Sequence, residues 1–280
     1  MTRRWRTEAA GLIGSARRRL AGRDLALIAA GLTFYAGIAV VPLLVVTFAL
    51  TARLTSPETV RELGGRLVEL LPDQLGAPAA VGRLIAAGIS LDVWGGLLAL
   101  LPMSLYGEGL RRALLRFGDR RESLTSWRGR LLALPLLALT PLLLYLLLLA
   151  AGRMAELAET GGTAATIGRI ALGFYSVLGV LMVPLAWGFR VVAGARVGWP
   201  ALLAGVFFTA ACLSGFLQGF VLFLALPLHL GAPFGGFTAV GSVVAVGLWL
   251  FLLHLVLLVG WLLTQALDER LSRSANRGGR

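Results

Sequence analysis

An unbroken apolar run near the carboxyl end is the feature that most constrains the fold. Residues 237–267 carry no formal charge, and the run ends in Asp268, Glu269 and Arg270. A helix rises 1.5 Å per residue, so about 20 residues cross the apolar layer of a bilayer, which is about 30 Å thick. The run therefore predicts a membrane-spanning helix that is long enough to tilt or to project beyond the bilayer.

The composition places the whole chain in the same class. Hydrophobic residues make up 58% of the 280 residues and charged residues 14%, with a mean hydropathy of +0.83. Soluble domains average about 25% charged residues. A single cysteine, Cys212, excludes a disulfide within the chain, and the two histidines do not form a metal-binding motif. We therefore expect an integral membrane protein that is all-α.

Six spans account for the apolar segments, and no linker divides them. We expect spans at residues 25–52, 93–110, 131–152, 170–189, 200–225 and 237–267. Asp24 is placed to cap the first of these helices. One membrane domain, residues 1–280, is predicted, with a tail at residues 268–280.

Two further segments have helical periodicity. Residues 1–24 carry arginines around an apolar stripe, which predicts an amphipathic helix on the membrane surface; an ordinary basic tail is the alternative. The polar interval 53–92 predicts short amphipathic helices on the far face of the membrane, broken at Pro72 and Pro78.

The arginines predict the orientation. All 26 basic residues are arginine; with six spans, 20 of them fall in the two tails and the loops that share their side, and six fall on the other side. Basic residues are enriched in cytoplasmic loops. We therefore expect a multi-pass protein of the inner (plasma) membrane with both termini in the cytoplasm.

Two stretches resemble the YihY/BrkB virulence factor family. The first is AAGLTFYAGIAVVPLL, in which an alanine-rich helix with a tyrosine leads to a Pro-Leu pair, here Ala29, Ala30, Tyr35, Pro42 and Leu43. The second is a tryptophan eleven positions before a glycine in the last span, here Trp249 and Gly260. The arginine-rich segment after span two and the Trp199-Pro200 pair agree. The resemblance covers nearly the whole chain.

The resemblance implies a six-helix membrane bundle and several functional labels. Members have been labelled ribonuclease BN, linked to serum resistance or suspected of transport. The family pattern places Ala-Glu after the last-span glycine, whereas this chain has Trp261 and Leu262. Phe237 and Thr238 stand where a Tyr-Gly pair often opens the last span, and Leu115 stands where an asparagine is frequent.

Few polar side chains lie inside the predicted spans. Tyr35, Gln218 and His254 are the candidates for a substrate path, because polar and ionisable groups within a bilayer are costly and often functional. Packing or a hydrogen bond between helices is the alternative for each. Gly215 and Gly219 form a GxxxG pair, which predicts a close-packing face or a self-association surface.

A charged group near the end of span two is the second candidate site. Glu108 and Arg112 are spaced to pair on one helical face, and Arg111 lies beside them. The arginines predict a site for an anionic headgroup; simple anchoring to anionic lipid is the alternative.

No arrangement of residues predicts catalysis. The acidic residues lie mostly in loops and tails without a metal-ligand spacing, and no nucleophile elbow or phosphate-binding glycine pattern is present. We expect no enzyme activity, no cofactor or metal, and no nucleic-acid partner; membrane lipids are the expected partners. The leading hypothesis is a transporter or handler of a lipid-like or amphipathic substrate. The alternative is a non-transporting scaffold for cell-envelope partners.

Overall fold

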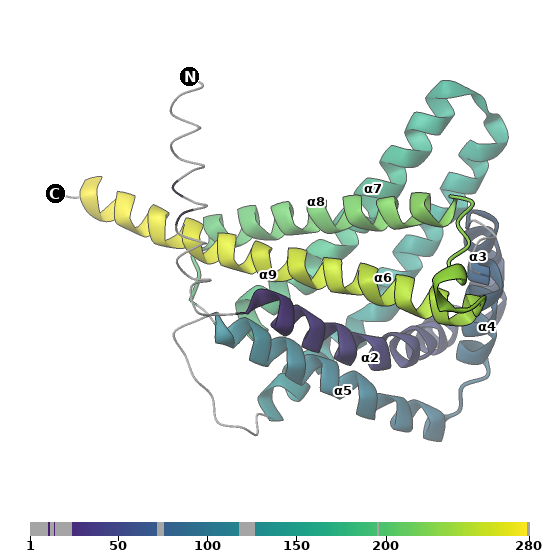
Figure 1. The fold of residues 1–280 in the computed structure, drawn as a ribbon, viewed down its shortest axis with the longest axis horizontal. Coiled ribbons are helices and arrows are strands. Elements are labelled where there is room, and N and C mark those ends of the chain that lie inside the picture. Colours follow the sequence, from purple (N-terminus) through teal and green to yellow (C-terminus); the bar gives the residue numbers. More distant parts are fainter. Residues whose placement is uncertain are drawn as a thin grey trace.

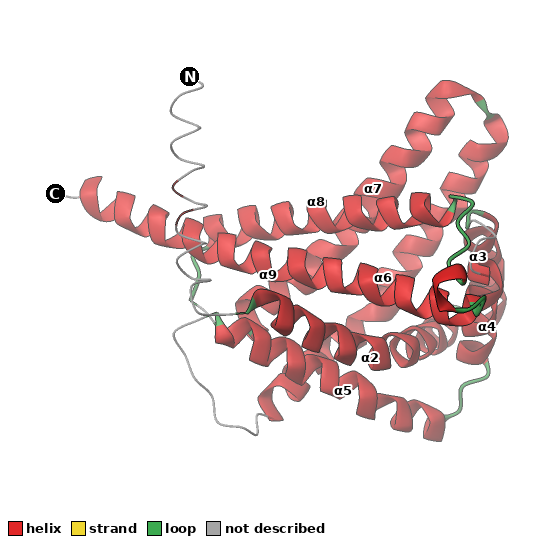
Figure 2. Ribbon diagram, viewed as in Figure 1, coloured by secondary structure: helices red, strands yellow, loops and turns green. Residues whose placement is uncertain are grey.

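Helices make up almost all of the described chain. The computed structural model describes residues 24–71, 76–117, 127–194 and 196–278, together with Gly11 and Gly14, and this part contains no strand (Figure 2). Among the described residues, five helices are long and apolar enough to cross a membrane: α2 (Leu25–Leu54), α6 (Trp127–Thr160), α7 (Gly162–Trp187), α8 (Trp199–Leu224) and α9 (Thr238–Gly278). The predictions of an all-α fold and of several membrane-spanning helices are confirmed.

The second predicted span corresponds to α5 (Val93–Arg116), which is not among those five. Its 24 residues reach about 36 Å, but it carries Glu108 and three arginines in its second half. A sixth span therefore stays a prediction. The predicted helix over residues 1–24 and the break at Pro72 lie outside the described residues, apart from Gly11 and Gly14.

Two short helices fill the polar interval after α2. They are α3 (Pro57–Glu69) and α4 (Ala77–Ile89). Pro78 lies in the first turn of α4, where proline is tolerated, so it begins this helix. Both helices pack on the end of α2 in a small core of Phe48, Ala52, Val60 and Ile85. Their position on a membrane face stays a prediction.

The long helices form one bundle (Figure 1). α8 and α9 lie side by side and α2 lies against α9, with α5 beyond it, while α6 and α7 form a hairpin whose tip projects from the bundle. The amino ends of α2 and α8 lie at the same end of the bundle as the carboxyl ends of α5 and α9. The carboxyl-terminal part of α9 extends beyond its neighbours. These end positions are those expected for a chain that passes back and forth through the bundle.

α8 and α9 approach so closely that two glycines leave no room for a side chain. A Cβ atom at Gly260 would lie 2.0 Å from Oγ1 of Thr209, and one at Gly205 would lie 1.9 Å from Oγ1 of Thr264. Each threonine hydroxyl donates to the carbonyl of the glycine four residues earlier in its own helix. The contact is therefore reciprocal: a threonine of each helix packs against a glycine of the other.

We expect Gly260→Ala to lower the free energy of unfolding by about 1–3 kcal/mol, because the new methyl group must displace Thr209. Gly247→Ala, in the same helix, is the matched control, since nothing lies within 4 Å of its Cβ position. There the better helix propensity of alanine makes the change neutral or favourable by up to about 1 kcal/mol. Unfolding in detergent micelles measures both, and equal effects would contradict the proposed close contact.

Candidate functional site

His254 lies at the centre of a polar cluster between three helices. Its side chain, on α9, is 4% exposed. The Tyr106 hydroxyl from α5 lies 3.2 Å from Nε2, and Oγ1 of Thr33 from α2 lies 3.3 Å from Nδ1. We call Thr33, Tyr106 and His254 the histidine cluster. It joins the first, second and last of the predicted spans.

The hydrogen bonds define the protonation of the ring. Nδ1 lies 2.7 Å from the carbonyl oxygen of Leu250, and a carbonyl only accepts, so Nδ1 carries the proton. Nε2 is then the acceptor, and the Tyr106 hydroxyl donates to it. The Thr33 hydroxyl already donates to the carbonyl of Ala29, so it receives a longer, shared bond from Nδ1. Every polar atom of the neutral imidazole is therefore satisfied.

The cluster lies well inside the bundle. Thr33 is eight residues into α2, a rise of about 12 Å, and His254 is 14 residues before Asp268, about 21 Å along α9. Those depths fall within an apolar layer about 30 Å thick. Tyr106 was missed by the sequence reasoning; a tyrosine in a mostly apolar helix, four residues after Pro102, was the available signal.

The three predicted path residues do not share one set of contacts. Tyr35 lies against Gly109 of α5, where a Cβ atom would come within 2.6 Å of the Tyr35 ring. Since Tyr106 and Gly109 are three residues apart, Tyr35 and His254 contact the same turn of α5. Gln218 is elsewhere: its amide donates to the carbonyl of Ile170 in α7 at 3.0 Å.

The two arginines of the predicted headgroup site point in different directions. Arg112 is half-exposed and pairs with Glu108, whose other carboxylate oxygen accepts from Arg130 of α6 at 2.9 Å. Arg111 is 5% exposed and donates to the carbonyl of Val192. The structure therefore groups Glu108 with Arg112 and Arg130, and separates Arg111 from them.

Arg111 reaches the end of α7, where the helix widens into the π-helix η2 (Gly188–Val192). The carbonyls at a helix carboxyl end carry partial negative charge, which favours a cation there. Gly194 follows with φ of +59°, a left-handed conformation that favours glycine. Arg190, in the same turn of the π-helix, donates to Val197 and lies 4.9 Å from the Trp199 ring centroid.

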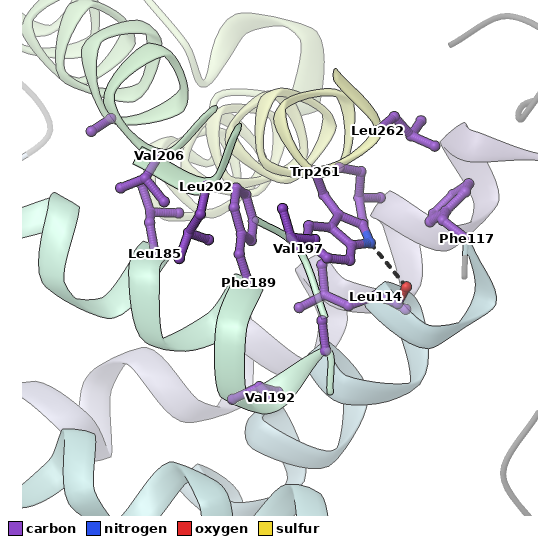
Figure 3. Close-up of a cluster of buried hydrophobic side chains, with 14 of the residues drawn as sticks. Leu114, Phe117, Leu185, Phe189, Val192, Val197, Leu202, Val206, Trp261 and Leu262 are labelled. Atoms are coloured by element: carbon purple, nitrogen blue, oxygen red, sulfur yellow. Dashed lines mark hydrogen bonds between the residues drawn. The ribbon is translucent and has the colours of Figure 1, made fainter. Parts of the chain in front are cut away.

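A cluster of buried apolar side chains lies between α5, α7, α8 and α9 (Figure 3). Trp261 is 1% exposed, donates its indole N–H to the carbonyl of Leu114 at 3.1 Å, and packs on Phe189. Leu262, the position where the resemblance led us to expect a carboxylate, is also 1% exposed and belongs to the same apolar cluster as Phe117. The surroundings of Leu262 are therefore apolar.

The family-motif positions have structural contacts. Trp249 lies among Phe216, Phe220 and Phe223 of α8, and a Cβ atom at Gly219 would lie 3.5 Å from its ring. Gly215 has nothing within 4 Å of its Cβ position. Gly260 is the close contact with Thr209 described above, and Pro42 lies inside α2. The predicted GxxxG pair thus contacts α9 at Gly219 alone.

A polar pocket of about 560 Å³ lies at the opposite end of the bundle, between α3 and α6. Its charged walls are Arg61, Glu62, Arg66, Glu69, Glu156 and Glu159. Arg66 pairs with Glu62 at 3.1 Å and with Glu156 at 3.5 Å, so it joins the two helices. Within the described residues, no group of three or more His, Cys, Asp or Glu side chains is placed to hold a metal ion.

Apolar helices of spanning length around a buried polar cluster define the class: the chain is a multi-pass integral membrane protein. It belongs to the virulence factor BrkB family, whose match covers residues 16–279, as the resemblance of the first and last spans predicts. No curated protein and no solved structure matches the chain.

We expect Tyr106→Phe to lower the free energy of unfolding by about 0.6 kcal/mol and by at most about 1.7 kcal/mol, the average and the maximum measured for hydrogen bonds between membrane helices. The change removes only the hydroxyl that donates to His254. Tyr145→Phe is the control, because the structure gives the hydroxyl of Tyr145 no hydrogen bond. A double-mutant cycle of Tyr106→Phe with His254→Leu isolates the coupling, and a coupling of zero would contradict the bond.

Neighbouring arginines should respond differently to the same substitution. Arg111→Gln leaves the buried carbonyl of Val192 without its donor and should cost about 1–3 kcal/mol. Arg112→Gln removes a half-exposed ion pair and should cost less than about 1 kcal/mol. Thermal unfolding of the two purified variants makes the comparison. The opposite order would show that Arg111 is not the structural arginine.

Proposed function

We propose that this protein moves or handles a lipid-like or amphipathic substrate. The observation that carries the proposal is the histidine cluster, a satisfied polar group at mid-depth in an otherwise apolar bundle. Polar side chains within a bilayer are costly and commonly mark a path. The bonds of His254 to Tyr106 and to Thr33 join side chains of different helices, so a substrate headgroup can replace these two when the helices separate.

Prolines support the required movement. Pro42, Pro102, Pro135, Pro141 and Pro184 lie inside long helices, where each removes a backbone donor. Pro102 is one turn before Tyr106, so bending there moves the Tyr106 hydroxyl away from α9. Separating α5 from α2 at Gly109 would expose the hydroxyls of Tyr35 and Tyr106 together. The scarcity of charged side chains in the spans favours an apolar cargo over an ion.

The proposal includes six spans, an inner-membrane location and cytoplasmic termini. α5 is the sixth span, and its 24 residues suffice for a layer of about 30 Å. The 20 arginines on the side of the termini support that orientation. It includes no catalytic reaction, and turnover of RNA by the purified protein would contradict that part.

Lipid translocation in liposomes tests the proposal. The full chain is reconstituted with a fluorescent phospholipid, and a membrane-impermeant quencher reports how fast the inner label becomes accessible. We expect translocation above that of protein-free liposomes, slowed several-fold by His254→Leu with Tyr106→Phe and unchanged by Tyr145→Phe. Folded protein that gives no translocation, and no flux of an amphipathic solute, would reject the proposal.

A scaffold that recruits cell-envelope partners is the second candidate. The observation that favours it is the buried apolar core around Trp261 and Leu262 at the arginine-rich end, which offers no polar group to a substrate. Crosslinking that recovers one stoichiometric partner, together with absence of translocation, would favour this function over transport.

A further inference from the structure

We propose that Arg112 and Arg130 form a binding site for the phosphate of an anionic phospholipid at the arginine-rich end of the bundle. In this proposal Arg130 takes the place of Arg111, which the sequence had placed with Arg112 in the headgroup site. It requires only that the chain spans a membrane and does not depend on whether the protein moves a lipid.

Glu108 holds the guanidinium groups of Arg112 and Arg130 close together. Its carboxylate, 13% exposed, pairs with Arg112 through one oxygen and with Arg130 through the other. One residue is on α5 and the other on α6, so the carboxylate fixes the two arginines side by side across the helix boundary. Ordering them in advance lowers the entropic cost of binding a ligand.

Arg112 and Arg130 are accessible to a ligand and lie in a region of net positive charge. The side chains of Arg112 and Arg130 are 48% and 37% exposed. Arg116 is exposed one turn beyond Arg112 on the same face of α5. The three arginines and Glu108 together carry a charge of plus two, which attracts a singly charged phosphodiester. A guanidinium has five N–H donors in a planar fork that matches phosphate oxygens.

Exposed apolar side chains follow Arg130 along α6, and they favour a lipid over free phosphate as the ligand. Leu131 and Leu134, in the next turn of α6, are 57% and 49% exposed. α6 runs from this end into its apolar segment, so acyl chains would lie on these leucines while the phosphate lies at Arg130. A phosphate with acyl chains fits both surfaces, whereas free phosphate fits only the first.

Native mass spectrometry of the full chain in detergent, titrated with phosphatidylglycerol, resolves the binding of each lipid. We expect the first phosphatidylglycerol to bind roughly 25-fold more weakly in Arg112→Gln with Arg130→Gln, since each of the two basic residues contributes a factor of about five at a membrane surface. Arg112→Lys with Arg130→Lys should also weaken binding, because lysine keeps the charge and loses the fork.

Matched controls exclude a general effect of charge. Arg61 and Arg83 are exposed arginines of α3 and α4 at the other end of the bundle. The same pairs of substitutions there should leave the first binding step unchanged. Full affinity in the lysine variant would overturn the proposal, because it would show that undirected charge attraction suffices.

Two further measurements address the ligand and the fold. Replacing chloride by inorganic phosphate at constant ionic strength should not displace the lipid; displacement would overturn the lipid as the ligand. If the variants fail to fold, hydrogen exchange of the unmodified protein provides the test. Phosphatidylglycerol, compared with phosphatidylcholine, should protect residues 108–112 and 130–134, and equal exchange would overturn the site. Translocation in liposomes is a separate readout, so either proposal can fail alone.

Discussion

The contact between α8 and α9 fixes the positions on which the rest of the bundle depends. In a bilayer, helices gain little by burying apolar side chains against each other, because lipid tails are equally apolar. Close backbone approach and hydrogen bonds therefore carry more weight. Thr209 packs on Gly260 and Thr264 packs on Gly205. These two contacts set the rotation of α9 about its axis. That rotation decides which residues of α9 face α2 and α5.

A second face of α9, about 100° round the helix from the first, follows from that choice. His254, Leu258, Trp261 and Gln265 are all buried and recur at intervals of three and four residues, which places them on one stripe. His254 meets α2 and α5 at mid-depth, and Trp261 bonds to the end of α5. α9 is thus a central helix with a small-residue face toward α8 and a hydrogen-bonding face toward α5. The histidine cluster and the apolar core around Trp261 therefore lie one after the other along the same face of α9.

Much of this fold could be predicted from the sequence, because apolar length is a one-dimensional property. The starts of α2 and α8 and the cap at Asp24 follow from local chemistry, and the Asp24 carboxylate does accept the N–H of Leu27. Contacts between helices are another matter. Arg111 and Arg112 are neighbours in sequence, but 100° of helical rotation sends one into the core and leaves the other exposed. Tyr106 and Gly205 likewise gain their roles only from a partner on a distant helix.

The apolar replacement at Leu262 bears on what this member can share with its family. An ionised carboxylate at that position would be desolvated beside Phe117 and Trp261, and burial of an unpaired charge is strongly unfavourable. The packing around Leu262 therefore accommodates an apolar side chain and excludes an unpaired carboxylate. α9 does carry buried polar side chains: Thr264 and Gln265 lie close to Leu262 in sequence, and His254 lies two turns deeper, about 12 Å away along the helix. The Leu250 carbonyl places the proton of His254 on Nδ1, and the Tyr106 hydroxyl completes the ring by donating to Nε2, so this polar group is held by contacts with its own helix and with α5.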